Sequence, residues 1–279
     1  MKKTKLVLLI SIVINLFLSG ILIYVLFTKY PHRLPQSNKL KTEDISLFKN
    51  DSRTMVALTL GQSNAANYSD VKYKVKRAVY SYNKGELYKA NDPLPGASDK
   101  GGSVWSVLGD MLIDSSLYDK VIIIPIAEGG TNISCWGSGN CNKTLIETLK
   151  DLKQRNIQLT HVFLHQGESD NLQNTSKETY KNELQKVLKT INTYQVNTPF
   201  YISIASFHSH AINKPGGIDT NIQNAQKEFI NEHRNVYMGA FTDTIIHAID
   251  RYDGIHFSGY GIKKYATSWF NAIKNRKKN

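Results

Sequence analysis

Cysteine is scarce in this chain: its 279 residues contain two, Cys135 and Cys141, in one loop rich in Gly, Ser and Asn. No further pair of metal ligands stands near them, so the spacing does not indicate a zinc site. In a domain outside the cytoplasm the two thiols would close a small disulfide loop. The alternative is a pair of free loop cysteines.

Acidic residues are missing from both ends of the chain, which accounts for most of its net charge of +12. Residues 1–33 carry five cations and residues 274–279 carry four, and neither segment contains an acid. The remaining body has a charge of about +3 and no Lys/Arg run interleaved with aromatic residues. A surface that binds nucleic acid is therefore not expected.

Charge is also absent from Leu6 to Phe27, an apolar stretch long enough to cross a bilayer as one helix. The lysines before it favour a cytoplasmic N-terminus, which puts the rest of the chain outside the cytoplasm. A cleaved signal peptide is the alternative, although the stretch is longer than the usual apolar region and no clear cleavage site follows. The expected organisation is a membrane anchor at 1–28, a linker at 29–51 and one catalytic domain at 52–279.

The body lacks internal repeats and low-complexity segments, and short apolar runs alternate with amphipathic segments. This alternation is typical of a parallel sheet covered by helices on both faces. The sequence predicts a three-layer, doubly wound, flavodoxin-like α/β domain with a mostly parallel five-stranded sheet. Residues 71–94 are expected to form an irregular, hairpin-like border. The expected strands are 55–60, 121–127, 160–165, 199–205 and 236–241, and the expected helices are 104–115, 144–155, 177–194, 218–233 and 259–274.

The Gly-x-Ser-x-Gly motif of α/β-hydrolases is missing, but another serine stands at a turn between strand and helix. Ser63 follows the first expected strand within Gly61-Gln-Ser-Asn64. Ligands bind at the carboxyl edge of an open α/β sheet, and helix N-terminal amides there favour developing negative charge. Taken alone, the same residues would also suit an ordinary helix N-cap.

Later turns supply the partners that a nucleophilic serine needs. Asp253 stands three residues before His256, so its carboxylate can orient the imidazole while the other ring nitrogen faces a nucleophile. Gly129-Gly-Thr131 puts flexible backbone directly after the second strand, where an N–H can be directed at an oxyanion. Gln166 ends the third strand with a neutral side-chain donor.

Other polar residues near these turns are assigned no chemistry. Glu168 and Asp170 are interpreted as scaffold or solvated turn residues, because a carboxylate would oppose a developing oxyanion. His208 and His210 have no third ligand at a zinc-like spacing. No metal and no organic cofactor is expected. Aromatic residues that could stack on a sugar ring are Tyr68, Trp105, Trp136 and Phe257. The alternatives are core packing for Trp105 and loop anchoring for Trp136.

In this order and on these turns, the motifs resemble those of the SGNH (GDSL-like) hydrolase superfamily. They are most similar to the branch that contains sialate O-acetylesterases and acetyl xylan esterases. The resemblance spans roughly residues 53–273. Its motifs are Gly61-Gln-Ser-Asn64, Gly129-Gly-Thr-Asn-Ile133 with Trp136 following, His165-Gln-Gly-Glu-Ser-Asp170 and Asp253-x-x-His256.

The resemblance implies a serine esterase that removes O-acetyl groups from a carbohydrate through an acetyl-enzyme. Ser63 would be the nucleophile, His256 the general base and Asp253 its orienting acid. The backbone amides of Ser63 and Gly130, with the Gln166 side chain, would form the oxyanion hole. Many members carry Asn where Gln166 stands, and the sequence does not decide between Gly129 and Gly130. Residues assigned to substrate binding are Gln62, Asn64, Trp136 and Glu168.

Two other functions fit the same residues. An O-acetyltransferase that modifies a cell-surface polysaccharide would use the same triad, with a sugar hydroxyl in place of water. A non-catalytic glycan-binding domain would be favoured if a triad residue were missing, and none is. The expected partners are an acetylated carbohydrate and, through the N-terminal helix, a membrane; the sequence leaves the glycan and the oligomeric state open.

Overall fold

Seven strands form one sheet in the computed structural model, which describes residues 52–195 and 197–277. Their order is β3-β2-β4-β1-β5-β6-β7, and every neighbouring pair is parallel except β2 and β3. Without the β2–β3 hairpin the order is the flavodoxin-like 2-1-3-4-5, so the expected α/β architecture is confirmed. The strands are β1 (Thr54–Gly61), β2 (Val79–Asn83), β3 (Glu86–Lys89), β4 (Lys120–Pro125), β5 (His161–His165), β6 (Phe200–Ile204) and β7 (Val236–Phe241).

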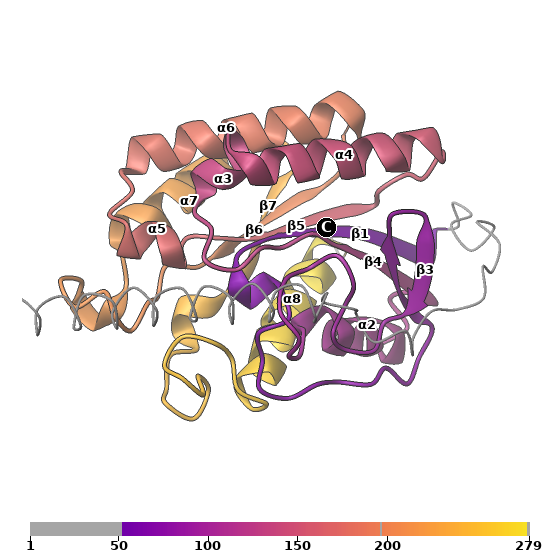
Figure 1. Ribbon diagram of the computed structural model, residues 1–279, viewed down its shortest axis with the longest axis horizontal. Coiled ribbons are helices and arrows are strands. Elements are labelled where there is room, and N and C mark those ends of the chain that lie inside the picture. The colour runs from indigo at the N-terminus through magenta and orange to yellow at the C-terminus, as the bar shows by residue number, and fades with distance from the viewer. Residues whose placement is uncertain (1–51, 196, 278–279) are drawn as a thin grey trace, which may run out of the picture. The chain divides into compact units, whose positions relative to one another are not determined.

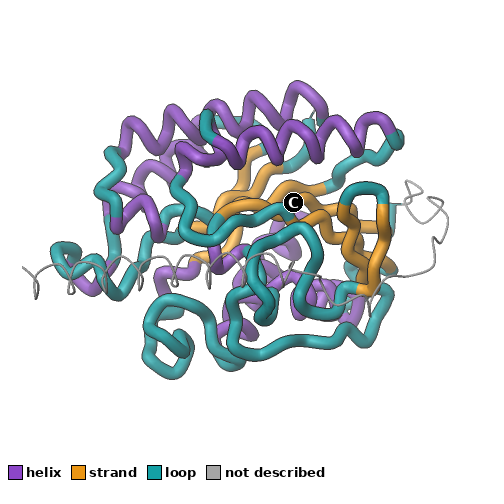
Figure 2. Tube along the Cα trace, in the orientation of Figure 1, coloured by secondary structure: helices purple, strands orange, loops and turns teal. Residues whose placement is uncertain are grey.

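Helices cover both faces of the sheet, as Figures 1 and 2 show. Alternate residues of β1 divide between two apolar cores: Val56 and Leu58 pack with α3, α4, α6 and α7, and Met55 and Ala57 pack with α2 and α8. This division follows from the two-residue period of a strand buried on both sides. The helices are α2 (Val104–Asp114), α3 (Ile133–Gly137), α4 (Asn140–Gln154), α5 (Glu168–Leu172), α6 (Lys177–Tyr194), α7 (Thr220–Glu232) and α8 (Gly261–Lys277), with 3-10 turns η3 (Ser63–Ala65), η4 (Pro215–Gly217) and η5 (Thr242–Thr244).

The prediction of five strands was wrong, because the segment at 71–94 contributes two more. Lys84 and Gly85 both have positive φ, at 48° and 84°, which is the backbone of a two-residue type I′ hairpin turn. β2 also pairs in parallel with β4, from Val79 opposite Val121. The hairpin therefore extends the sheet at this edge.

The expected membrane anchor at 1–28 and the linker at 29–51 lie outside the described residues. Within the part that the structure describes, no helix combines the length and the apolar character needed to cross a bilayer.

Candidate active site

The turns that follow β1 and β5 lie in direct contact at the carboxyl edge of the sheet. The backbone amide of Gln62 donates to the carbonyl oxygen of His165 over 3.0 Å. Gly61, with φ +129°, leaves no room for a side chain, since a Cβ would lie 1.9 Å from that same oxygen. This close approach brings the residues after both strands together.

Ser63 begins the 3-10 turn η3 directly after β1 and is 5% exposed. The indole of Trp105 holds this turn in place, because its Nε1 donates to the carbonyl oxygen of Ala65 over 2.7 Å. Among the described residues, neither the hydroxyl nor the backbone amide of Ser63 has a hydrogen-bond partner. Both groups are therefore free to act on a ligand.

Asp253 and His256 face one another in the loop before α8. The Nδ1 of His256 lies 2.6 Å from Oδ2 of Asp253, and the backbone amides of Ile255 and His256 donate to Oδ1. Burial alone would raise the pKa of Asp253, but these hydrogen bonds hold it below its usual value. The carboxylate thus fixes one ring nitrogen, and Nε2 has no partner in the described part of the chain.

Asn64 joins the serine turn to the histidine loop. Its Nδ2 donates to the carbonyl oxygen of Ile255 over 3.2 Å, and its Oδ1 accepts from the amide of Phe257 over 3.3 Å. These two residues flank His256 on either side. One amide side chain next to Ser63 therefore holds the loop that carries His256 and Asp253.

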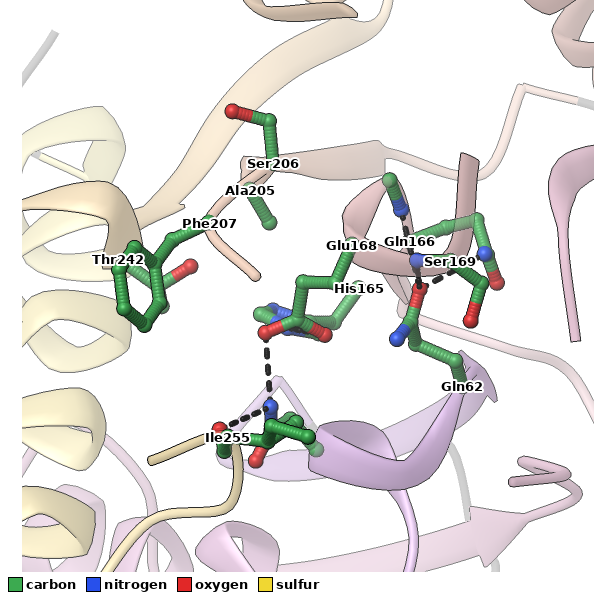
Figure 3. A network of polar contacts seen from close by, with 12 residues as sticks. Gln62, His165, Gln166, Glu168, Ser169, Ala205, Ser206, Phe207, Thr242 and Ile255 are labelled. Carbon is green, nitrogen blue, oxygen red and sulfur yellow. Dashed lines mark hydrogen bonds and ion pairs between the residues drawn. The ribbon is translucent and has the colours of Figure 1, made fainter. Parts of the chain in front are cut away.

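A buried charged group lies beneath this junction, with Glu168 at its centre. Its Oε1 lies 2.7 Å from Nδ2 of Asn64 and 3.3 Å from Nη1 of Arg251, and its Oε2 lies 3.1 Å from Nε2 of His165. Arg251 also donates to the carbonyl oxygen of Ile255 over 2.6 Å. Figure 3 shows the Glu168 carboxylate with its contact on the side of Ile255. Burial alone would raise the pKa of Glu168, but His165, Arg251 and Asn64 lower it to about 2.

The two glycines after β4 have different hydrogen bonds. The amide of Gly129 donates to Oγ of Ser98 over 2.8 Å. The amide of Gly130 has no acceptor among the described residues, and a Cβ at this position would meet nothing within 4 Å. Gly130 therefore has the free N–H in open space, and its φ of +71° suits glycine.

Gln166 has contacts different from those expected of an oxyanion donor. Its Nε2 donates to Oε1 of Gln62 at 2.9 Å (Figure 3). The same nitrogen also donates to the carbonyl oxygen of Thr131 at 2.7 Å and to Oδ2 of Asp170 at 3.1 Å. The side-chain amide of Gln166 has two N–H groups, and three internal acceptors already compete for them. Neither N–H is therefore left for a substrate oxygen in this arrangement. Gln62 Oε1 also accepts from the amides of Gly167 and Ser169, so this pair fastens two turns together.

The four residues assigned to substrate binding are all buried and occupied by internal contacts. Trp136 belongs to α3, has no exposed surface and packs in the core, where its Nε1 donates to Oγ1 of Thr131 over 3.2 Å. It cannot stack on a sugar, and that expectation is corrected: the indole of Trp136 holds Thr131, in the turn before α3. Gln62, Asn64 and Glu168 support the site through the contacts described above. The structure also joins Cys135 to Cys141 by a disulfide, which links α3 to α4 where the sequence had indicated a loop.

Tyr68 is the only one of the four suggested aromatic residues whose side chain is not buried. Its ring stacks on the His256 imidazole, with centroids 4.8 Å apart and planes at 28°. Its hydroxyl lies against Gly129, since a Cβ there would be 2.1 Å from Tyr68 Oη. Burial raises the pKa of Tyr68, and a hydrogen bond with Ser98 partly offsets that rise. Tyr68 therefore contacts both the histidine and the glycine turn.

The contact of Tyr68 with the histidine and the role of Arg251 were not predicted from the sequence. For Arg251 a signal was available, because this charged residue stands two positions before Asp253. No comparable signal existed for Tyr68, because its contact with His256 joins residues far apart in the chain. Within 52–195 and 197–277, no group of three or more His, Cys, Asp or Glu side chains could hold a metal ion.

Comparison with known proteins adds a family match. The model of the family described as carbohydrate esterase, sialic acid-specific acetylesterase matches residues 53–267. No curated protein matches the chain in sequence.

Solved structures share the fold at low sequence identity. A protein from Arabidopsis thaliana is 16% identical with a TM-score of 0.64, over 81% of this chain and 99% of its own. A family 3 carbohydrate esterase from Clostridium thermocellum is 15% identical with a TM-score of 0.54, over 81% and 98%. The psychrotrophic esterase EstA from a Pseudoalteromonas species, in a structure inhibited by monoethylphosphonate, is 14% identical with a TM-score of 0.52, over 81% and 100%.

Proposed function

Because this chain belongs to the carbohydrate esterase family of sialic acid-specific acetylesterases, within the SGNH hydrolase superfamily, we propose that Ser63, His256 and Asp253 form its catalytic triad. The protein is a carbohydrate acetylesterase, and these three residues would perform its reaction. The observation that carries it is the Asn64 side chain, which ties the Ser63 turn to both neighbours of His256. The free hydroxyl of Ser63 and the free Nε2 of His256 belong to the two segments that it joins.

In this mechanism Ser63 Oγ attacks the acetyl carbonyl carbon while His256 Nε2 takes the hydroxyl proton. Asp253 keeps Nδ1 protonated and stabilises the imidazolium that forms. The tetrahedral intermediate then expels the sugar oxygen, which receives the proton from His256. A water molecule deprotonated by His256 next attacks the acetyl-enzyme, and acetate leaves as Ser63 regains its proton.

The oxyanion of each intermediate would be stabilised by the backbone amides of Ser63 and Gly130. Both N–H groups lack acceptors among the described residues, whereas the amide of Gly129 is used by Ser98. Donors that are fixed before the reaction cost no reorganisation when charge develops. Gln166 would act indirectly, because its amide holds Thr131 beside the Gly129–Gly130 turn; a direct donor role would require it to release an internal acceptor.

Trapping the covalent intermediate tests this function. The enzyme is mixed with an acetylated sugar, quenched in acid within the first turnovers and digested for peptide mass spectrometry. We expect an acetyl group on the peptide that contains Ser63, with free acetate as the product in water. Acetyl groups that move to an added sugar with little free acetate would instead indicate a transferase, and acetylation elsewhere would contradict the assignment of Ser63.

Tyr68 is proposed as a positioning residue for His256. Replacing Tyr68 with Leu removes the stacked ring, and since aromatic pairs contribute about 0.5–1.5 kcal/mol, we expect kcat to fall by up to about tenfold with KM little changed. Tyr68→Phe keeps the ring and is expected to restore most of kcat. Steady-state kinetics on 4-nitrophenyl acetate measure both variants, with the exposed Tyr260→Leu as the matched control. Equal losses in the Leu and Phe variants would refute the positioning role.

The domain is further proposed to lie outside the cytoplasm, held by the apolar segment at residues 6–27. The disulfide between Cys135 and Cys141 supports this, because disulfides persist in oxidising compartments and are rare in the cytosol. Digestion of the domain by protease added to intact cells would check the location, and full protection would oppose it.

A further inference from the structure

We propose that a pocket between the β2–β3 hairpin and helix α4 is an accessory subsite for one neutral sugar unit of a longer acetylated chain. The inference rests on the proposed function and extends it from an acetylated sugar to an acetylated oligosaccharide or polysaccharide. The pocket has a volume of about 210 Å³. It lies at the carboxyl ends of β2 and β4, on the edge of the sheet that carries Ser63.

The pocket has an apolar floor and a polar rim. Its floor is made by Ile124, Ile126 and the ring of Tyr82, which are all buried. Its rim combines hairpin residues with one face of α4, where polar side chains recur at helical spacing. A sugar ring has apolar C–H faces and polar edges, so this division suits it. The rim residues are Asn83, Lys84, Thr144, Glu147, Thr148 and Asp151.

Most of the rim is free to bind. Asp151 is occupied, because it accepts from the Tyr82 hydroxyl and pairs with Arg155. In the described part of the chain, the side chains of Lys84, Thr144, Glu147 and Thr148 have no hydrogen-bond or ion-pair partner. Together they offer hydroxyl, carboxylate and ammonium groups, the donors and acceptors that sugar hydroxyls need.

The size and charge of the pocket define the ligand. Sites for drug-sized molecules measure about 300–1,000 Å³, so a smaller pocket suits a single ring. The free ammonium of Lys84 and the free carboxylate of Glu147 balance in charge, and Asp151 is balanced by Arg155. The lining therefore favours a neutral unit over an anionic one.

One short segment connects the pocket to the proposed catalytic site. At Gly96 a Cβ would lie 2.3 Å from the carbonyl oxygen of Pro125 and 3.2 Å from Oδ1 of Asn83 at the pocket. Two residues later, Ser98 donates its amide to Ala127 and accepts from the amide of Gly129. A chain with its acetyl group at Ser63 would cross this segment to reach the pocket.

A chain-length series tests the subsite. Chemically acetylated xylo-oligosaccharides, from the monosaccharide to the hexamer, are compared with acetylated gluco- and manno-oligosaccharides of the same lengths. The readout is the ratio of kcat/KM for acetate release to kcat/KM for 4-nitrophenyl acetate. In at least one neutral series, we expect this ratio to rise about tenfold with length and then level off once the chain reaches the pocket.

Filling the pocket should remove that rise. In Thr148→Trp the ratio is expected to stay at its monosaccharide value, while Lys150→Trp, on the same helix but outside the pocket, keeps the full rise. Glu147→Ala, which removes a rim carboxylate without adding bulk, should show a partial loss. Melting temperatures of all variants identify any that fail to fold.

Two results would overturn the subsite: no length dependence in any neutral series, or a length dependence that survives Thr148→Trp. Either can occur while 4-nitrophenyl acetate is still hydrolysed through Ser63, so the proposed function would stand. If the unmodified enzyme hydrolysed no acetyl ester at all, the proposed function itself would be refuted.

Discussion

Replacing Ser63 with Ala is expected to lower kcat for acetyl-ester hydrolysis by about 10⁴-fold or more. The residues that follow Ser63 in η3, Asn64 and Ala65, carry no hydroxyl that could replace it. Binding would survive, since the change removes one oxygen atom from a turn that Trp105 holds through the backbone of Ala65. Steady-state kinetics with 4-nitrophenyl acetate and with acetylated glycans measure the loss.

Ser169 provides the matched control for this prediction. It is also a buried serine at the carboxyl edge, in α5, and it contacts Gln62 through its backbone amide rather than its side chain. Ser169→Ala should therefore keep kcat within a few-fold of the original. If Ser63→Ala retained more than about a hundredth of the activity, the assignment of the nucleophile would be wrong.

Replacing Glu168 with Gln is expected to give the largest loss of stability, about 3–5 kcal/mol in the free energy of unfolding. The change leaves the guanidinium of Arg251, which is 2% exposed, without its carboxylate in the interior. A surface group gives the comparison: Glu228→Gln weakens half-exposed contacts with Lys177 and Lys181, and its effect on stability should be much smaller. Urea denaturation of the three proteins at neutral pH measures both differences.

The pH dependence of this loss follows from the lowered pKa of Glu168. Its carboxyl has a folded-state pKa of about 2, below the ordinary value of 4.5. The stabilisation is therefore fully present above about pH 4.5 and declines as the pH falls towards 2. Burial raises the pKa values of Asp92 and Asp170 to about 6, and these two groups oppose the decline in stability at low pH. They do so equally in the original protein and in Glu168→Gln, so their effect cancels in the difference between the two unfolding free energies. A difference in stability that stays constant from pH 7 to pH 3 would contradict the ionised state of Glu168.

A second variant separates the charge of Glu168 from its packing. Arg251→Met removes the opposite partner, and the double variant removes both charges. We expect the double variant to be less destabilised than the sum of the two single changes, because no unpaired ion remains buried. Exact additivity would mean that the two groups do not interact.

The apolar strands were predictable because strands buried on both faces leave continuous hydrophobic runs in the sequence. Val236–Phe241 was predicted to the residue, as was the long helix Lys177–Tyr194. Strand β2 (Val79–Asn83) of the hairpin was not recognised as part of the sheet, because its tyrosines alternate with polar residues and give no continuous apolar run. The five-residue helices α3 and α5 are too short to show a helical period.

The candidate site was predictable only as far as chain position carries information. Ser63, Gly130 and Gln166 follow strands that lie side by side, so topology alone brings their turns to one edge. Their hydrogen bonds depend on residues far apart in the chain. The pairing of Gln62 with Gln166 and the use of Gly129 by Ser98 became visible only in three dimensions. Such contacts distinguish a free donor from an occupied one.

The bridge made by Asn64 has a consequence for biosynthesis. It joins the first turn of the domain to residues that lie shortly before α8, 191 and 193 positions later. A growing polypeptide that has emerged from the ribosome only as far as α7 lacks the histidine loop altogether. Esterase activity would therefore appear only after nearly the whole domain has been translated, and hydrolysis of an acetyl ester would report that its two distant ends have met.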